Sequence, residues 1–400
     1  MRVGISSPIA SEIIGGGHTF EQEIFERLLE AVPSTQHQFV VFVESKSTAQ
    51  RTKRSNISYV TLKRPLIQKV RLRARSTAHR VLPRVVPPNL NSWEEPWIPR
   101  LVSDAQIEFF LNIKPGTLTI DVPFLTVVWD LQHRLQPYFP EVTANGQWEA
   151  RESFYSQVLR RATFVIAGTE AGKKEIEILY DVPEDRIRIL PHPTPRFALE
   201  GSTSGKDELA SYRLPPNYVF YPAQFWPHKN HVGLLRAIHH LKRVENISLP
   251  VVFVGSDHGN REHVRREAKN LNLEEQVFFL GYVSRAALCA LYQKAFALCY
   301  VSFFGPENLP PLEAFALGCP VIAADVPGAS EQFGDAAIRI NPMNEIEIAG
   351  ALQSLLRDPT KRAALITRGK ERALRFTGTD FAKGLIALLD EFEAIRRCWN

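Results

Sequence analysis

The sequence predicts an α/β protein that contains two doubly wound parallel sheets. Short β-branched and aromatic runs alternate with amphipathic helical patterns along most of its 400 residues, an order typical of parallel sheets flanked by helices. The alternation breaks once, at a stretch rich in proline, glycine and serine, and then starts again. Because 400 residues exceed one ordinary hydrophobic core, we expect two Rossmann-like domains that face each other across a cleft.

The first half contains a series of candidate strands and, after the first of them, one clear helix. The helix is expected over Phe20–Val32, where Phe20, Ile24 and Leu28 recur on one stripe. The strand candidates are short and apolar enough to be buried on both faces. They are Arg2–Ser6, Gln38–Val43, Ile57–Leu62, Ile107–Leu111, Phe124–Val128, Phe164–Ala167 and Ile187–Leu190.

A linker and a second alternation follow. Pro191, Pro193 and Pro195 precede the glycine- and serine-rich segment Leu199–Lys206, which marks a break between domains. Strands are then expected at Tyr218–Tyr221, Val251–Gly255, Val277–Leu280, Ala297–Val301 and Val321–Ala324, with helices between them at His231–Val244, Arg261–Leu271, Arg285–Lys294 and Pro311–Leu317. We therefore expect a first domain over residues 1–195, a second over residues 196–379, and a final helix near residues 380–400.

Composition excludes several classes of protein. With 44% apolar and 23% charged residues, the chain is typical of folded globular proteins and unlike disordered ones. No uncharged apolar run is long enough to span a bilayer, and the N-terminus is interpreted as a buried strand, not a signal peptide. The four cysteines include no CxxC pair, so we expect reduced thiols, no zinc site and a cytoplasmic location. They are Cys289, Cys299, Cys319 and Cys398.

Positive charge is concentrated in one segment, Arg51–Arg84. It contains no acidic residue, and its basic residues are Arg51, Lys53, Arg54, Lys63, Arg64, Lys69, Arg71, Arg73, Arg75, Arg80 and Arg84. One interpretation is a solvated basic helix; the other is a surface that contacts an anionic inner membrane face peripherally. No nucleic-acid-binding motif accompanies the segment, so nucleic acid is not an expected partner.

Three glycines precede the first predicted helix. Gly15, Gly16 and Gly17 would let backbone N–H groups approach a ligand at the helix N-terminus. The pattern is neither GxGxxG nor a P-loop. A ligand-binding turn and a plain tight turn therefore both stay open.

A second candidate site follows the strand Phe124–Val128. Asp130 and His133 come after the carboxyl end of this strand, the end that faces the ligand in open α/β sheets. An acid and a histidine there can act on hydroxyl groups by hydrogen bonding or proton transfer. The alternative is a loop cap with a surface histidine.

In the second half, the loop between a strand and the helix His231–Val244 contains Gln224 and Lys229. Lys229 comes directly before the helix N-terminus, where a cation and the helix dipole can bind phosphate together. A lysine before a helix is common, but aromatic residues and prolines restrict this loop.

The segment from Tyr300 to Asp325 reads as strand, rigid loop, helix, glycine stop and strand. Pro310 and Pro311 favour the first helical turn, and Glu313 follows in that turn. Amides at the helix start can bind a diphosphate, while the Glu313 carboxylate can accept hydrogen bonds from a ribose diol. Glu307 and Asn308 precede the helix and can reach sugar hydroxyls. The structural alternative is that Glu313 only complements the helix dipole.

This segment resembles the retaining glycosyltransferase family 4, which has the two-domain GT-B fold, and within it the mannosyltransferases. The matching motifs are Leu312-Glu313-Ala314, Gly318-Cys319-Pro320-Val321-Ile322 and Gly328-Ala329-Ser330-Glu331. Further similar runs are Val254-Gly255-Ser256, Leu280-Gly281-Tyr282-Val283 and Gly334-Asp335-Ala336-Ala337. The resemblance covers nearly all of residues 100–355 and includes the N-terminal glycine loop.

The resemblance implies a nucleoside-diphosphate sugar on the second domain and an acceptor on the first. The donor-binding residues are then Gly16, Gly17, Gln224, Lys229, Gly255, Glu307, Asn308, Leu309, Pro310 and Glu313; the candidate catalytic residues are Asp130, His133 and Lys229. It implies retention at the anomeric carbon without a metal or further cofactor. GDP-mannose or a UDP-hexose is the expected donor, with mannose favoured. A glycan or lipid-linked glycan of a cell-surface polysaccharide is the expected acceptor. By the same analogy, the final helix packs back onto the first domain.

Three positions depart from the family pattern. The first family glutamate is replaced by Gly305, the arginine often paired with the phosphate-binding lysine is replaced by Gln224, and the histidine before Asp130 is replaced by Trp129. These departures keep two alternatives open: an isomerase like the UDP-sugar 2-epimerases, and a non-catalytic GT-B partner subunit. An NAD dehydrogenase is not favoured, because neither half has the dinucleotide fingerprint with its acid about 20 residues on.

Overall fold

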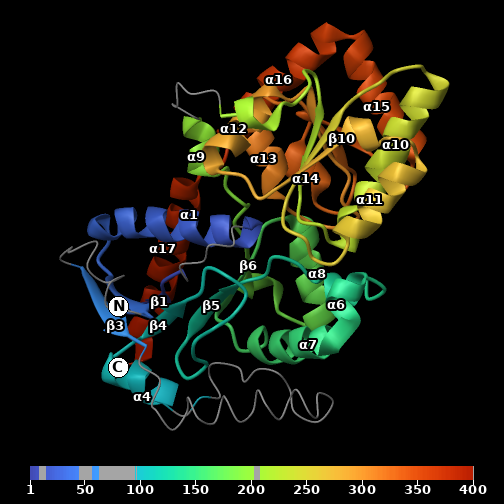
Figure 1. Ribbon diagram of the computed structural model, residues 1–400. Coiled ribbons are helices and arrows are strands. Elements are labelled where there is room, and N and C mark those ends of the chain that lie inside the picture. Colours follow the sequence, from blue (N-terminus) through green and yellow to red (C-terminus); the bar gives the residue numbers. More distant parts are fainter. Residues whose placement is uncertain (9–14, 45–55, 63–94, 96, 202–207, 400) are drawn as a thin grey trace. The chain divides into compact units, whose positions relative to one another are not determined.

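The structure is a computed structural model that describes residues 1–8, 15–44, 56–62, 95, 97–201 and 208–399 (Figure 1). It divides into two compact units. The first comprises Met1–Gly168, Lys173–Leu190 and Thr379–Asn400, and the second comprises Thr169–Gly172 and Pro191–Gly378. Each unit contains one parallel sheet, so the α/β class with two doubly wound sheets is confirmed.

The first sheet has seven parallel strands in the order β3-β2-β1-β4-β5-β6-β7. The strands are β1 (Arg2–Ser6), β2 (Gln38–Val43), β3 (Ile57–Thr61), β4 (Phe109–Leu111), β5 (Phe124–Val127), β6 (Phe164–Ala167) and β7 (Ile187–Ile189). Val3 pairs with Phe39 on one side and with Phe109 on the other, so the strand order reverses at β1. Ligands of open α/β sheets bind at the carboxyl ends of the strands beside such a reversal.

Helices pack against this sheet because its strands are apolar on both faces. The helices are α1 (Gly16–Ala31), α4 (Trp97–Asp104), α5 (Gln132–Leu135), α6 (Pro140–Thr143), α7 (Gln147–Val158) and α8 (Glu170–Tyr180), with 3-10 turns at Val32–Ser34, Ala144–Gly146 and Glu184–Arg186. Phe42, Phe110 and Val165 lie in one buried core cluster with Val158 of α7 and Ile176 of α8.

The C-terminal helix α17 (Gly378–Arg396) packs against the first unit. The Phe381 ring meets Phe20 of α1 edge-on at 5.3 Å, and the Phe392 ring lies 4.9 Å from Phe109 of β4. Polar contacts lie beside Phe392, at Asp390 and Glu393.

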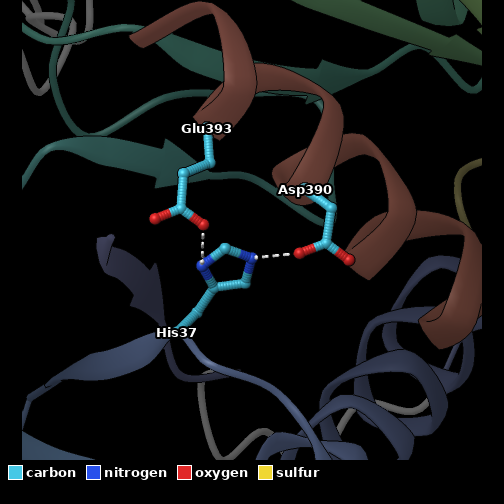
Figure 2. Close-up of side chains that lie close together, drawn as sticks. All are labelled: His37, Asp390 and Glu393. Atoms are coloured by element: carbon cyan, nitrogen blue, oxygen red, sulfur yellow. Dashed lines mark hydrogen bonds and ion pairs between the residues drawn. The ribbon is translucent and has the colours of Figure 1, made fainter. Parts of the chain in front are cut away.

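Figure 2 shows the imidazole of His37 between the carboxylates of Asp390 and Glu393. His37 Nε2 lies 3.1 Å from Asp390 Oδ1, and His37 Nδ1 lies 3.7 Å from Glu393 Oε2. Burial nevertheless lowers the pKa of His37. The trio joins the start of β2 to α17.

The second sheet has six parallel strands in the order β10-β9-β8-β11-β12-β13. They are β8 (Val219–Pro222), β9 (Val251–Val254), β10 (Val277–Gly281), β11 (Ala297–Tyr300), β12 (Val321–Ala324) and β13 (Ala337–Ile340). Val219 pairs with Val251 of β9 and with Ala297 of β11, so the order reverses at β8. Strand β13 is not among the strands predicted from the sequence.

Eight α-helices accompany the described part of the second unit. They are α9 (Arg196–Glu200), α10 (His231–Val244), α11 (Arg261–Asn270), α12 (Arg285–Lys294), α13 (Leu309–Ala316), α14 (Ala329–Phe333), α15 (Glu345–Arg357) and α16 (Pro359–Ala373), with 3-10 turns at Ala210–Tyr212, Pro227–Lys229 and Glu274–Gln276. Side-chain caps define two of the starts: Asn230 accepts a hydrogen bond from Gly233 N at 3.1 Å, and Ser284 accepts one from Ala287 N at 3.1 Å.

Three expectations from the sequence concern membrane-spanning helices, the basic segment and the cysteines. Among the helices that the structure describes, none combines the length and apolar character needed to cross a bilayer. Apart from residues 56–62, the basic segment Arg51–Arg84 lies outside the described residues. All four cysteines are free thiols, as expected, and only Cys398 is exposed.

Candidate functional site

The loops after β8 and β9 approach each other backbone to backbone. Gly255 has φ +151°, and a Cβ added there would lie 2.3 Å from the carbonyl oxygen of Ala223. Phe225 N donates a hydrogen bond to Ser256 O at 3.0 Å across the same contact. Only glycine fits this position, so the backbones of the two loops are in close contact beside β8, where the strand order reverses.

Lys229 ends the 3-10 turn directly before α10. Its Nζ donates a hydrogen bond of 3.0 Å to the hydroxyl of Tyr300, at the end of β11, and lies 5.4 Å from the centre of that ring. The hydroxyl of Tyr221 donates to the backbone oxygen of Lys229. Within the described residues, no carboxylate forms an ion pair with Lys229, so its charge is held in place without being neutralised.

Gln224, the residue at the family arginine position, is engaged within its own loop. Its Oε1 accepts a hydrogen bond from Trp226 Nε1 at 3.0 Å. The indole of Trp226 in turn stacks on His258, with ring centres 4.0 Å apart and planes 16° apart. The loops after β8 and β9 therefore also share an aromatic stack.

Glu313 is buried on α13, with 7% of its surface exposed. The hydroxyl of Tyr292, on α12, donates a hydrogen bond of 2.6 Å to Glu313 Oε2. Burial raises the pKa of the Glu313 carboxyl to about 7, although the Tyr292 hydrogen bond and the charge of Arg285 oppose that rise. Near neutral pH, Glu313 can therefore exist as carboxylate or carboxylic acid.

The side chain of Glu307 is 6% exposed, and it points to the backbone of an earlier segment. It accepts a hydrogen bond of 2.6 Å from His192 N. Burial raises the pKa of Glu307 to about 8, and the negative charge of Glu331 adds to this rise. One carboxyl oxygen of Glu307 is thus engaged by the backbone of His192 in this conformation.

Asn308 stabilises the loop before α13. Its backbone N donates to Gln332 Oε1 and its backbone O accepts from Gln332 Nε2, both at 3.0 Å. Its Nδ2 donates to Gly305 O at 2.9 Å. Leu309 and Pro310 then form the start of α13, with Leu309 buried and Pro310 half-buried.

The same loop explains why residue 305 is a glycine. Gly305 has φ +136°, and a Cβ added there would lie 2.6 Å from the amide group of Asn308. A glutamate at this position would require a different loop conformation. The replacement of the family glutamate and the Asn308 hydrogen bond are therefore parts of one local arrangement.

In the first unit, the glycine turn meets an aromatic ring. Gly16 and Gly17 begin α1, and a Cβ added to Gly17 would lie 2.7 Å from the ring of Trp129. Trp129 Nε1 is buried, and the described residues provide no hydrogen-bond acceptor for it. The structure thus brings together two segments that the sequence analysis singled out separately.

Asp130 and His133 follow β5, but both are engaged within the unit. Asp130 accepts a hydrogen bond from Gln132 N at 3.0 Å and forms an ion pair with Arg151 of α7. His133 is fully buried, and its Nε2 lies 3.0 Å from the Tyr180 hydroxyl.

Burial, with the charge of Arg151, lowers the pKa of His133 to about 4, so the ring is neutral at pH 7. The alternative of a surface histidine is wrong, since His133 is fully buried. The catalytic role of His133 stays a prediction.

Residues 209–372 match the family model of the glycosyl transferases, group 1. The matched region lies within the second unit. All predicted donor-binding residues of the second half, from Gln224 to Glu313, lie within the matched region.

Curated proteins similar to this chain include bacterial mannosyltransferases. The O-antigen chain mannosyltransferase RfbU of Salmonella typhimurium is 26% identical over 197 residues, 49% of this chain and 52% of that protein. The D-inositol 3-phosphate glycosyltransferase of Rhodococcus erythropolis is 29% identical over 248 residues, 59% of this chain and 55% of that protein. The matched part therefore spans about half the length of these relatives.

Solved structures extend the likeness to the whole chain at the level of the fold. Sucrose-phosphate synthase from Thermosynechococcus elongatus has a TM-score of 0.71 at 17% identity and covers 98% of this chain and 99% of its own. Anabaena HepE, solved in complex with UDP-glucose, has a TM-score of 0.67 at 17% identity and covers 98% and 100%. The GT-B fold that the sequence predicts is confirmed by these similarities.

Several residues beside the predicted ones have no signal in the sequence. Tyr292 and Tyr300 contact Glu313 and Lys229, and Arg151 pairs with Asp130, from other elements. Glu175 of α8 is half-buried, and burial with the charge of Asp130 raises its pKa to about 7. Each becomes noticeable only once the packing of the helices is known.

Proposed function

We propose that this chain is a retaining glycosyltransferase that transfers a hexose from a nucleoside-diphosphate sugar to a hydroxyl group of a glycan. The observation that carries the proposal is the placement of Lys229 and Glu313 within the group 1 domain. Each is hydrogen-bonded to one tyrosine hydroxyl, Lys229 to that of Tyr300 and Glu313 to that of Tyr292. The second unit therefore contains a cation suited to a diphosphate and a carboxylate suited to a ribose diol.

Lys229 and backbone amides at the start of α13 are the groups we assign to the leaving diphosphate. As the bond from the anomeric carbon to the diphosphate breaks, negative charge develops on the phosphate oxygens, and preoriented positive groups stabilise it. In this proposal, neither a metal ion nor a further cofactor stabilises the leaving diphosphate. An oxygen of the leaving phosphate takes the proton of the acceptor hydroxyl. The acceptor oxygen then bonds to the anomeric carbon on the face that the diphosphate leaves, as the family resemblance implies.

GDP-mannose is the donor we propose first, and UDP-glucose the second. Relatives named as O-antigen chain mannosyltransferases support mannose, and the UDP-glucose complex of HepE supports a uridine donor as the alternative. The same relatives support a glycan of a cell-surface polysaccharide, free or lipid-linked, as the acceptor. Peripheral contact with an anionic membrane through Arg51–Arg84 stays a prediction from the sequence.

One observation favours a second candidate, a non-catalytic partner subunit. The loop at Gly305 has no room for the family glutamate, and Glu307 is held by His192 N. If neither residue contacts the donor sugar, the domain would bind a nucleotide sugar without transferring the hexose.

The test begins with calorimetric titration of GDP, UDP, GDP-mannose and UDP-glucose into the full chain. Glu313→Ala should weaken binding of the preferred nucleotide about tenfold, because a charge-assisted hydrogen bond is lost. Glu262→Ala, which removes an exposed acid of the same unit, should leave binding unchanged.

Transfer is then followed by NMR of the product formed with a mannoside or glucoside acceptor. Retention predicts that the new bond has the anomeric configuration of the donor. Absence of nucleotide binding at millimolar concentration would overturn the proposal. Conversion of the sugar without an acceptor would indicate an epimerase, and binding without any turnover would indicate the partner subunit.

A further inference from the structure

The carboxyl group of Glu313 is only half engaged by the protein. Tyr292 donates to Oε2, and among the described residues no donor contacts Oε1. Oε1 does not belong to the fully buried polar atoms without a partner, so this oxygen is accessible from outside the protein. One oxygen is therefore fixed from inside the unit, and the other is left for a hydrogen bond from outside the protein.

Tyr292 is itself held rigidly. It is fully buried on α12, and its ring meets Phe220 of β8 edge-on, with centres 4.9 Å apart and planes at 89°. The Ser284 side chain caps the start of α12, the helix that carries Tyr292. A buried phenol in a fixed position defines where the carboxyl it contacts can lie.

We infer that Tyr292 is a positioning residue for nucleotide binding, which turns the carboxyl of Glu313 so that Oε1 meets the ribose hydroxyls of a nucleoside diphosphate. This inference rests on the proposed function, and it adds a residue that contacts no substrate itself. Three groups on α12 share the electrostatic environment of Glu313: Tyr292, Arg285 and Cys289. Among them, only Tyr292 forms a hydrogen bond with the carboxyl.

The inference also predicts how nucleotide affinity depends on pH. A ribose diol donates hydrogen bonds, so it needs the ionised form of Glu313, which accepts at both oxygens. The Tyr292 hydrogen bond lowers the pKa of Glu313, against the rise caused by burial. Loss of the hydroxyl therefore moves the pH at which nucleotide affinity is half lost to a higher value.

The experiment compares Tyr292→Phe with Tyr218→Phe in the full chain. Tyr218 is equally buried, and its hydroxyl donates to the backbone oxygen of Leu291 at 2.7 Å, so its loss costs a similar hydrogen bond without touching Glu313. Dissociation constants for GDP and UDP are measured by calorimetry between pH 6 and pH 9. Unfolding midpoints are recorded for both variants to verify that they fold.

The expected result is that Tyr292→Phe binds the preferred nucleotide about tenfold more weakly at pH 7, which corresponds to one hydrogen bond to a charged group. Its affinity should recover as the pH rises, whereas Tyr218→Phe should bind as the wild type does. In the background of Glu313→Gln, Tyr292→Phe should have no further effect on affinity, because Tyr292 acts through the carboxylate.

Equal weakening in both tyrosine variants, or a full effect of Tyr292→Phe in the Glu313→Gln background, would overturn the positioning role. So would unchanged affinity of Tyr292→Phe across the pH range. In each case the wild type still binds nucleotide and the proposed function stands. If the wild type binds neither GDP nor UDP, the proposed function fails and this inference fails with it.

Discussion

The two units differ in the contacts of the residues that follow the carboxyl ends of their strands. In the first unit, Asp130 is neutralised by Arg151, and the turn at Gly17 meets the side chain of Trp129. In the second unit, Lys229 is anchored by a neutral hydroxyl, and the loop at Gly255 meets a backbone carbonyl.

The difference bears on what each edge can bind. An ion pair inside the protein satisfies its own charges, whereas a lysine held by a phenol keeps its charge for a ligand. A contact between backbones is rigid, while the far end of an aromatic side chain can move. The second unit is therefore preorganised for an anion, and the edge of the first unit is more adaptable.

The largest effect is expected at the glycines. Gly255→Ala would place a methyl group 2.3 Å from Ala223 O at a positive φ, so we expect a loss of about 3 kcal/mol in the free energy of unfolding. Gly17→Ala meets only the tip of the Trp129 ring and gains helix propensity, so its cost should be about 1 kcal/mol or less. Urea unfolding of both variants measures the difference.

Gly350→Ala is the matched control, since a Cβ there meets nothing within 4 Å and the position lies inside α15. It should stabilise the protein by about 0.5–1 kcal/mol. If Gly17→Ala proved as costly as Gly255→Ala, the contrast between a rigid and an adaptable edge would be lost.

The next largest effect separates the two cations. Lys229→Ala should weaken binding of a nucleoside diphosphate about 100-fold, or about 2.7 kcal/mol, with little change in the unfolding free energy. Arg151→Ala should do the reverse, because it leaves the partly buried Asp130 carboxylate unpaired and costs about 1–2 kcal/mol of stability. Calorimetry with GDP and UDP, beside urea unfolding, measures both quantities for each variant. A clear loss of nucleotide affinity in Arg151→Ala would contradict the assignment of a structural role to that pair.

Much of the fold follows from local patterns in the sequence, and the site does so only in part. The strands Arg2–Ser6, Gln38–Val43 and Phe164–Ala167 have the predicted limits, since buried parallel strands are recognisable apolar runs. The missed strand Ala337–Ile340 pairs only with β12 and is mostly half-buried or exposed, so its residues form no such run.

The residues that surround the predicted site could not be found in the same way. Glu313 and Lys229 were predicted from motifs next to helix starts. Their partners Tyr292 and Tyr300 lie on α12 and β11, and the match between those elements depends on how they pack. The clash that excludes a side chain at Gly305 likewise depends on the Asn308 rotamer and not on a sequence pattern.

The last contrast between the units is a pair of opposite pH dependences. The pKa of Glu307 is about 8, above its ordinary value of 4.5, so between those values the folded protein keeps a proton that the unfolded chain releases. Stability then falls with rising pH by at most about 1.4 kcal/mol per pH unit. The pKa of His133 is about 4, below its ordinary value of 6.5, so its contribution falls as the pH decreases between these values.

Each contribution can be isolated by one substitution. Glu307→Gln should gain stability relative to the wild type as the pH is raised from 5 to 7.5. His133→Gln should gain it as the pH is lowered from 6.5 to 4.5, in a site that also contains Glu152, Asp130 and Arg151. Urea unfolding across this range measures both differences. Burial disfavours the charged form of both groups, so it raises the pKa of an acid and lowers the pKa of a base. If the stability of the two variants changed in the same direction with pH, burial would not be the cause of the two pKa shifts.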